Sequence, residues 1–229
     1  MTSTIPHDAP PTTLRLLRGV IFDMDGVLVD SEPFIAEAAS RMFAEKGFTV
    51  GHEAYRPFVG MGEDRFIGGP AEALGIPLDP VADKARTYAI YIELIKGKLG
   101  PLPGVHDFVA ECRRRGLAIA VASSADAIKV NANLSAIGLP PDRFDAVVDG
   151  LQVARKKPAP DIFLEAARRL NLPPANCLVV EDAIAGVAAA KSAGMRCLGL
   201  TTTFKADQLS EADWTAADLA HAPVATIDW

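Results

Sequence analysis

Residues 18–23 read R-G-V-I-F-D, a short apolar run that ends on a carboxylate, Asp23. The residues that follow, M-D-G-V-L at 24–28, add a second carboxylate, Asp25, and a glycine. A short, continuous apolar run of this kind is typical of a strand that is buried on both faces. Residues 117–122, L-A-I-A-V-A, repeat the form and are followed by Ser123 and Ser124. Both stretches therefore predict strands of a parallel sheet, with polar side chains where each strand ends.

Further strands and helices alternate along the chain. Strand patterns cover 145–148, 177–180 and 195–200, and helical patterns cover 105–115, 127–137, 162–170 and 184–193. Strands that alternate with helices are connected as parallel neighbours, with the helices packed on the faces of the sheet. The sequence thus predicts an α/β fold, a Rossmann-like parallel sheet with helices on both faces.

One long stretch, residues 33–99, breaks this alternation. It shows no strand pattern, but helical patterns cover 35–46, 71–74 and 81–96. We therefore expect an all-helical domain at 33–99, inserted into a core domain made of 14–32 and 100–229. Residues 1–13 have no basic region followed by an apolar run, so they are interpreted as a disordered tail and not as a signal peptide.

The composition argues against several classes of function. The chain has 29 acidic and 23 basic residues, a net charge of −6, which does not favour binding to nucleic acid or to an anionic membrane surface. Its apolar runs are too short to span a bilayer. Cys112, Cys177 and Cys197 lie far apart and form no zinc-binding pattern, which is typical of reduced thiols in the cytoplasm. We expect a cytoplasmic monomer whose partner is a small molecule.

Ligands of parallel sheets bind beyond the carboxyl ends of the strands, so the residues that follow each apolar run carry the functional prediction. Three acids with a nearby glycine make an oxygen-rich site suited to Mg²⁺, and a lysine and a serine hydroxyl suit a phosphate group. The residues at these positions are Asp23 and Asp25, Ser123 and Ser124, Glu181 and Asp182, and Lys157 in a loop before a helix.

Four segments resemble, in order, the four motifs of the haloacid dehalogenase superfamily. They are V-I-F-D-M-D-G-V-L at 20–28, V-A-S-S at 121–124, K-K-P-A-P-D-I-F at 156–163 and V-V-E-D-A-I-A-G at 179–186. The resemblance extends from Gly19 to about Thr202. The inserted helices resemble the α-helical cap domain of the subgroup that includes β-phosphoglucomutases and small phosphatases.

The resemblance implies a role for each motif residue. Asp23 is expected to be the nucleophile, and Asp25 the acid that protonates the leaving oxygen and then the base that activates water. Mg²⁺ is expected on the Asp23 side chain, the Asp25 backbone carbonyl and Asp182, with Glu181 binding directly or through water. Ser123, Ser124 and Lys157 are expected to bind phosphate. The implied activity is hydrolysis of a phosphoric monoester, such as a sugar or polyol phosphate, through an aspartyl-phosphate.

Two alternatives remain open at this point. The first is a phosphomutase of the β-phosphoglucomutase type, in which cap histidine, arginine and lysine side chains bind the sugar. Here Ile35 stands at the histidine position, the turn at 60–66 has no arginine directly after the small residue, and Glu93 stands where the lysine is expected. Hydrolysis is therefore favoured, although Arg65, Lys96 or Lys98 could substitute. The second alternative is a non-catalytic phosphate-binding scaffold, which would be expected to lack a motif residue; all are present.

Overall fold

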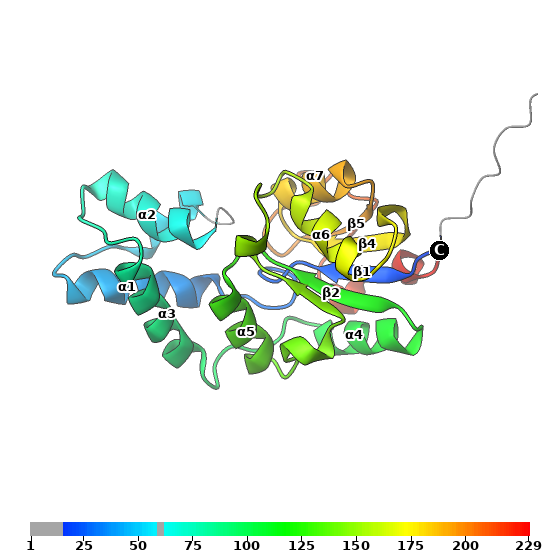
Figure 1. Cartoon of the computed structure of the whole chain (residues 1–229), viewed down its shortest axis with the longest axis horizontal. Coiled ribbons are helices and arrows are strands. Elements are labelled where there is room, and N and C mark those ends of the chain that lie inside the picture. The colour runs from blue at the N-terminus through cyan, green and yellow to red at the C-terminus, as the bar shows by residue number, and fades with distance from the viewer. Residues whose placement is uncertain (1–15, 59–61) are drawn as a thin grey trace, which may run out of the picture.

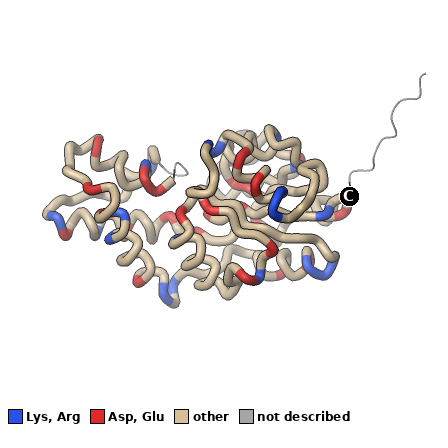
Figure 2. Tube along the Cα trace, viewed as in Figure 1, with Lys and Arg blue, Asp and Glu red and all other residues tan. Residues whose placement is uncertain are grey.

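The computed structural model describes residues 16–58 and 62–229 (Figure 1). The predicted tail, 1–13, lies outside the described residues, and so do the first two residues of the turn at 60–66. Acidic and basic residues are interspersed along both the cap and the core in Figure 2. Within the described part of the chain, no helix is long and apolar enough to cross a membrane.

A six-stranded parallel sheet lies at the centre of the core, in the order β3-β2-β1-β4-β5-β6. The strands are β1 (Gly19–Phe22), β2 (Ala118–Ala122), β3 (Ala146–Val148), β4 (Cys177–Glu181), β5 (Arg196–Leu200) and β6 (Trp214–Ala216). The predicted α/β fold is confirmed, and the five predicted strands agree within one residue at each end. The sixth, β6, was not predicted because it is a three-residue edge strand whose side chains are not buried.

Strand β1 owes its apolar sequence to burial on both faces. Ile21 packs in an apolar cluster with residues of the helices on one face, and Val20 and Phe22 pack in a second cluster on the other face. Successive side chains of a strand point to opposite faces, so a central strand needs an apolar residue at every position. The next residue, Asp23, therefore emerges at the carboxyl edge in the middle of the sheet.

Two pairs of helices cover the sheet. Helices α6 (Asp161–Arg169) and α7 (Ile184–Ser192) lie on one face in Figure 1, and α4 (Val105–Arg114) and α5 (Ala127–Ala136) lie on the other. The buried side of α6 is formed by Ile162, Phe163, Ala166 and Ala167. This arrangement confirms the predicted helices on both faces of the sheet.

Between β1 and β2 the chain forms the helical cap, which extends beyond one end of the core in Figure 1. Its elements are α1 (Glu32–Glu45), a 3₁₀ helix (His52–Phe58), α2 (Glu63–Leu74) and α3 (Ala82–Ile95). Helix α2 begins eight residues before the predicted 71–74 segment. The prediction is too short because the sequence G-G-P at 68–70 has low helix propensity and obscures the helical pattern. Burial of Phe66 and Ile67 against the cap compensates for this low propensity.

We predict that Ile162→Ala lowers the free energy of unfolding by about 2–5 kcal/mol, because Ile162 is only 2% exposed and its truncation leaves a cavity beneath α6. The matched control is Ile128→Ala on α5, where the side chain is 52% exposed and the loss should stay below about 1 kcal/mol. Urea denaturation followed by circular dichroism measures both values. Equal losses in the two variants would contradict the packing described here.

Candidate active site

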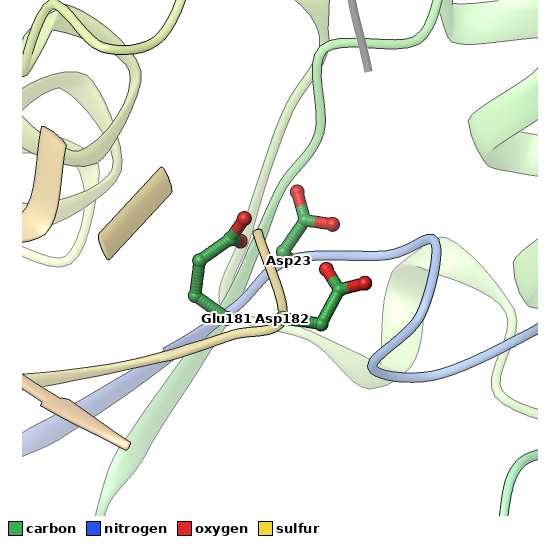
Figure 3. A group of neighbouring side chains, drawn as sticks. All are labelled: Asp23, Glu181 and Asp182. Atoms are coloured by element: carbon green, nitrogen blue, oxygen red, sulfur yellow. The ribbon is translucent and has the colours of Figure 1, made fainter. Parts of the chain in front are cut away.

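Three buried carboxylates lie together at the carboxyl edge of the sheet (Figure 3). Asp23 follows β1, Glu181 ends β4, and Asp182 follows it; one oxygen from each lies within 4.8 Å of the others. The two strands are neighbours, with Phe22 paired to Val180, and the Asp23 N–H donates to the Val180 carbonyl at 2.9 Å. The pairing of β1 with β4 thus brings together two motifs that are more than 150 residues apart in sequence.

Burial makes this cluster unfavourable for negative charge. Loss of water raises the pKa of Asp23 and raises that of Glu181 well above its ordinary value. Repulsion from Asp25 adds to the shift of the Asp23 pKa, and repulsion from Asp23 and Asp182 adds to that of Glu181. Burial and the nearby Asp23 charge raise the pKa of Asp182 to about 7. The cluster therefore requires protons or a cation for full stability.

One ammonium group supplies part of that positive charge. Lys157 Nζ donates to Asp23 Oδ1 at 2.5 Å and to Glu181 Oε2 at 3.2 Å, and its side chain is only 8% exposed. Burial alone would lower the pKa of Lys157, but the two carboxylates outweigh it and the pKa is raised. Lys157 is thus a fixed positive charge next to the Asp23 carboxylate, although it does not balance all three acids.

Two glycines allow the carboxylates to approach this closely. A Cβ atom at Gly26 would lie 1.9 Å from Asp182 Oδ2, and one at Gly186 would lie 1.9 Å from Glu181 Oε1. Gly26 also has a φ of +77°, which disfavours any other residue. Both positions are therefore part of the architecture of the acidic cluster.

The cluster fits a bound Mg²⁺ ion. Its oxygens are hard ligands, and the excess of carboxylates over lysine leaves negative charge for a divalent cation to neutralise. The side chains that would hold the ion are those of Asp23, Asp182 and Glu181. The Asp25 side chain is not in this cluster, and a metal contact from its backbone carbonyl stays a prediction.

The Asp25 carboxylate makes a separate set of contacts. Ser31 Oγ donates to Asp25 Oδ1, and Lys129 Nζ donates to Asp25 Oδ2 at 2.9 Å. The Asp25 side chain is 23% exposed, and it lines the same cavity as Asp23. Asp25 is therefore held by two donors beside the cluster and is free of the ion pairs that engage Asp23.

The predicted phosphate-binding residues surround the same space. Ser123 follows β2 and is 2% exposed, and its Oγ accepts a hydrogen bond from the Ala125 N–H at 3.1 Å. Ser124 is half-buried, and both serines line the cavity together with Lys157. The structure thus brings together all the residues that the sequence selected, from four separate segments.

A cavity of about 1040 Å³ lies between the cap and these residues. The cap contributes Ile35, Arg56, Phe58, Glu63 and Phe66 to its wall, among others. This volume is large enough for a small metabolite, since ligand pockets usually span about 300–1,000 Å³. The cavity therefore opens from the acidic cluster toward the cap.

Several residues are placed differently from the sequence interpretation. Arg65, Glu93, Lys96 and Lys98 do not line this cavity; Arg65 pairs with Glu72, and Glu93 pairs with Lys96 on the cap surface. Glu93 therefore gives no evidence against a mutase, whereas Ile35 does line the cavity.

Sequence reasoning missed three charged residues of the wall, Arg56, Glu63 and Lys129, because their segments meet the strand ends only in the folded cap and core. The signal that could have found Lys129 is its position in the first turn of the helix that follows β2, because in α/β folds such a turn lies near the ligand site. Lys156, which sequence reasoning leaves in solvent, is exposed but reaches the cavity wall and donates to the Gly150 carbonyl.

A model of the haloacid dehalogenase-like hydrolase family matches residues 17–194. The chain belongs to this family. The predicted family membership is thereby confirmed, and with it the resemblance to the helical-cap subgroup.

Three known proteins illustrate where this hydrolase lies within the family. It is 46% identical over 217 residues to the protein SUPPRESSOR OF QUENCHING 1, chloroplastic, of Arabidopsis thaliana; the match covers 91% of this chain but only 21% of that longer protein. It is 34% identical to the phosphorylated carbohydrates phosphatase of Thermotoga maritima, over 78% of this chain and 82% of the relative. A crystal structure of a CbbY variant from Rhodobacter sphaeroides in complex with xylulose-(1,5)-bisphosphate superposes with a TM-score of 0.83, at 28% identity, over 93% of this chain and 100% of that chain.

The charge balance of the cluster predicts the effect of Asp182→Asn on stability. Because the pKa of Asp182 is raised, its carboxylate destabilises the folded protein above pH 7, and the variant should melt at a higher temperature than the wild type at pH 8 without metal. Addition of Mg²⁺ should raise the melting temperature of the wild type, since a ligand that binds only the folded state stabilises it, and should have little effect on the variant.

Differential scanning fluorimetry with and without Mg²⁺ measures both shifts. The matched control is Asp142→Asn, an exposed position in the core, which should respond to Mg²⁺ as the wild type does. A full Mg²⁺ shift in Asp182→Asn would contradict the assignment of this carboxylate to the metal site.

Proposed function

We propose that this hydrolase is a magnesium-dependent phosphatase that cleaves a small phosphorylated sugar or polyol through an aspartyl-phosphate on Asp23. The observation that carries the proposal is the pairing of two carboxylates with different surroundings. Asp23 is buried against Lys157 in the acidic cluster, and Asp25 lies outside the cluster with its own donors. Two carboxylates in distinct environments are suited to divide the roles of nucleophile and acid–base catalyst.

In the first half of the reaction, an oxygen of the Asp23 carboxylate attacks phosphorus and the bond from phosphorus to the leaving oxygen breaks. Asp25, in its protonated form, gives its proton to that oxygen, and the free alcohol departs. Lys157 and the Ser123 hydroxyl face the transferring group, whose charge spreads over its equatorial oxygens. Their contribution is positional and electrostatic.

In the second half, water attacks the phosphorus of the aspartyl-phosphate and Asp25, now a carboxylate, accepts the proton. Inorganic phosphate leaves and the Asp23 carboxylate is regenerated. A bound Mg²⁺ ion would neutralise the negative charge that the cluster and the phosphoryl group share. Asp25 gives up one proton in the first half and takes one back in the second, so atoms and charges balance.

The cap supports the choice of a small, polar leaving group. The wall of the cavity combines charged side chains, such as Arg56 and Glu63, with apolar ones, such as Ile35 and Phe66. Two relatives are named for, or contain, phosphorylated carbohydrates. This supports a sugar or polyol phosphate as the substrate class of the protein.

Hydrolysis is favoured over phosphoryl transfer to a second sugar hydroxyl. Ile35 occupies the position where the mutases carry a sugar-binding histidine, and it lines the cavity with an apolar side chain. Without this histidine, a phosphorylated sugar intermediate would be bound less firmly while it reorients in the cavity. The cytoplasmic location, the monomeric state and the absence of nucleic-acid or membrane partners stay predictions.

Incubation with Mg²⁺ and a panel of phosphate monoesters, including β-glucose 1-phosphate, tests this function. We expect release of inorganic phosphate without formation of an isomeric phosphate, followed by a phosphate assay and by chromatography. A dominant isomeric product would identify a mutase instead. No turnover of any ester would favour a phosphate-binding scaffold.

Asp23→Asn should lower kcat by at least about three orders of magnitude, because an amide is not a nucleophile toward phosphorus. Asp142→Asn makes the same chemical change at an exposed position and should retain the wild-type rate. Thermal unfolding of both variants checks that they are folded. Residual activity of a folded Asp23→Asn near the wild-type value would exclude Asp23 as the nucleophile.

A further inference from the structure

We propose that Lys129 is a positioning residue for the Asp25 carboxylate, and that Glu63 makes this positioning depend on the cap. The inference rests on the proposed function, in which Asp25 moves protons to and from the leaving group. It adds two residues outside the four motifs, one from the core and one from the cap.

A single buried ammonium group connects the two parts of the molecule. Lys129 lies in the first turn of α5, and its side chain is 5% exposed. Its Nζ lies 2.9 Å from Asp25 Oδ2 and 3.4 Å from Glu63 Oε1. Glu63 is the first residue of the cap helix α2, with a side chain that is 6% exposed. The three groups thus form an ion-paired chain from the core acid to the cap.

Burial makes these contacts strongly interdependent. A charged side chain that is removed from water must be paired, and removal of one partner leaves the other uncompensated. Asp25 and Glu63 share the same ammonium, so a displacement of the cap that changes the distance from Glu63 to Lys129 changes how strongly Lys129 holds Asp25. The orientation of the acid is therefore coupled to the position of the cap.

The remaining oxygen of each carboxylate has a distinct environment. Asp25 Oδ1 accepts from Ser31 Oγ, so both oxygens of Asp25 are fixed by donors. Glu63 Oε2, in contrast, is buried and has no hydrogen-bond partner among the described residues, and Glu63 lines the cavity. In the part of the chain that the structure describes, one carboxylate oxygen of the cap is thus buried and unpaired beside the Lys129 contact.

The chemistry of the leaving group separates positioning from a merely structural role. An alkoxide is a poor leaving group and needs the proton of Asp25, whereas p-nitrophenolate leaves without one. A misplaced acid should therefore slow hydrolysis of glycerol phosphate far more than hydrolysis of p-nitrophenyl phosphate. General misfolding or loss of protein would slow both by the same factor, since both rates come from the same preparation.

For Lys129→Met we expect kcat/KM for glycerol phosphate to fall at least about 10-fold more than kcat/KM for p-nitrophenyl phosphate, since general acid catalysis contributes about 10²–10⁴-fold. The comparison uses kcat/KM because this constant reports formation of the aspartyl-phosphate, the step that depends on the leaving group, whereas hydrolysis of the intermediate is common to both esters. Lys129→Arg keeps the charge, and its ratio of kcat/KM values for the two esters should be close to that of the wild type. An equal fall for both esters in Lys129→Met would overturn the positioning role.

Glu63→Gln tests the link to the cap and keeps the size of the side chain. It should shift the ratio of the two esters in the same direction as Lys129→Met, by a smaller factor. The double variant should be no more selective than Lys129→Met alone, because both changes act through one contact. If the effects of the two substitutions on the ratio multiplied in the double variant, the link through Lys129 would be contradicted.

Glu72→Gln is the matched control, since Glu72 lies on the same helix with a side chain that is 75% exposed. Its ratio of the two esters should equal that of the wild type. If the wild type hydrolyses both esters and the variants lose both rates equally, the proposed function stands and the positioning role fails. If the wild type hydrolyses neither ester, the phosphatase proposal fails, and the role given to Lys129 fails with it.

Discussion

The ion pair between Lys157 and Asp23 is the interaction on which the site depends. Three carboxylates are buried at the edge of the sheet, and their raised pKa values show that burial works against their charge. Lys157 holds Asp23 and Glu181 in place but leaves negative charge over. The same imbalance that destabilises the cluster suits it to a divalent cation, and we propose that a phosphate group binds beside that cation.

The parallel sheet explains how four distant segments meet at this point. Because β1 is flanked by β2 and β4, the residues that follow these strands converge at one edge. Those residues are Asp23, Ser123 and Asp182. The cap departs from the same edge, directly after the β1 motif, so the chain that carries the nucleophile also carries the wall opposite it. In the proposed function, the core therefore supplies the catalytic groups and the cap selects the leaving group.

The sequence predicts the core well and the cap poorly, for physical reasons. Strands buried on both faces leave continuous apolar runs, and the residues after them have few other reasons to be acidic, so Asp23, Glu181 and Asp182 could be selected without a structure. Helix α2 was hidden by its G-G-P segment, and the edge strand β6 is too short and too exposed to leave a pattern. In the sequence, Lys129 and Glu63 are indistinguishable from other charged residues of helices. Only the fold brings Lys129 Nζ within 3.4 Å of Glu63 Oε1.

We propose that the phosphoryl group is transferred twice, first to Asp23 and then to water. The most direct measurement uses a phosphorothioate ester made chiral at phosphorus with two oxygen isotopes, hydrolysed in water that carries the third isotope, with analysis of the configuration of the released thiophosphate. Each in-line displacement inverts phosphorus, so two displacements predict overall retention of configuration. Overall inversion would show that water attacks the ester directly, and would contradict the nucleophilic role of Asp23.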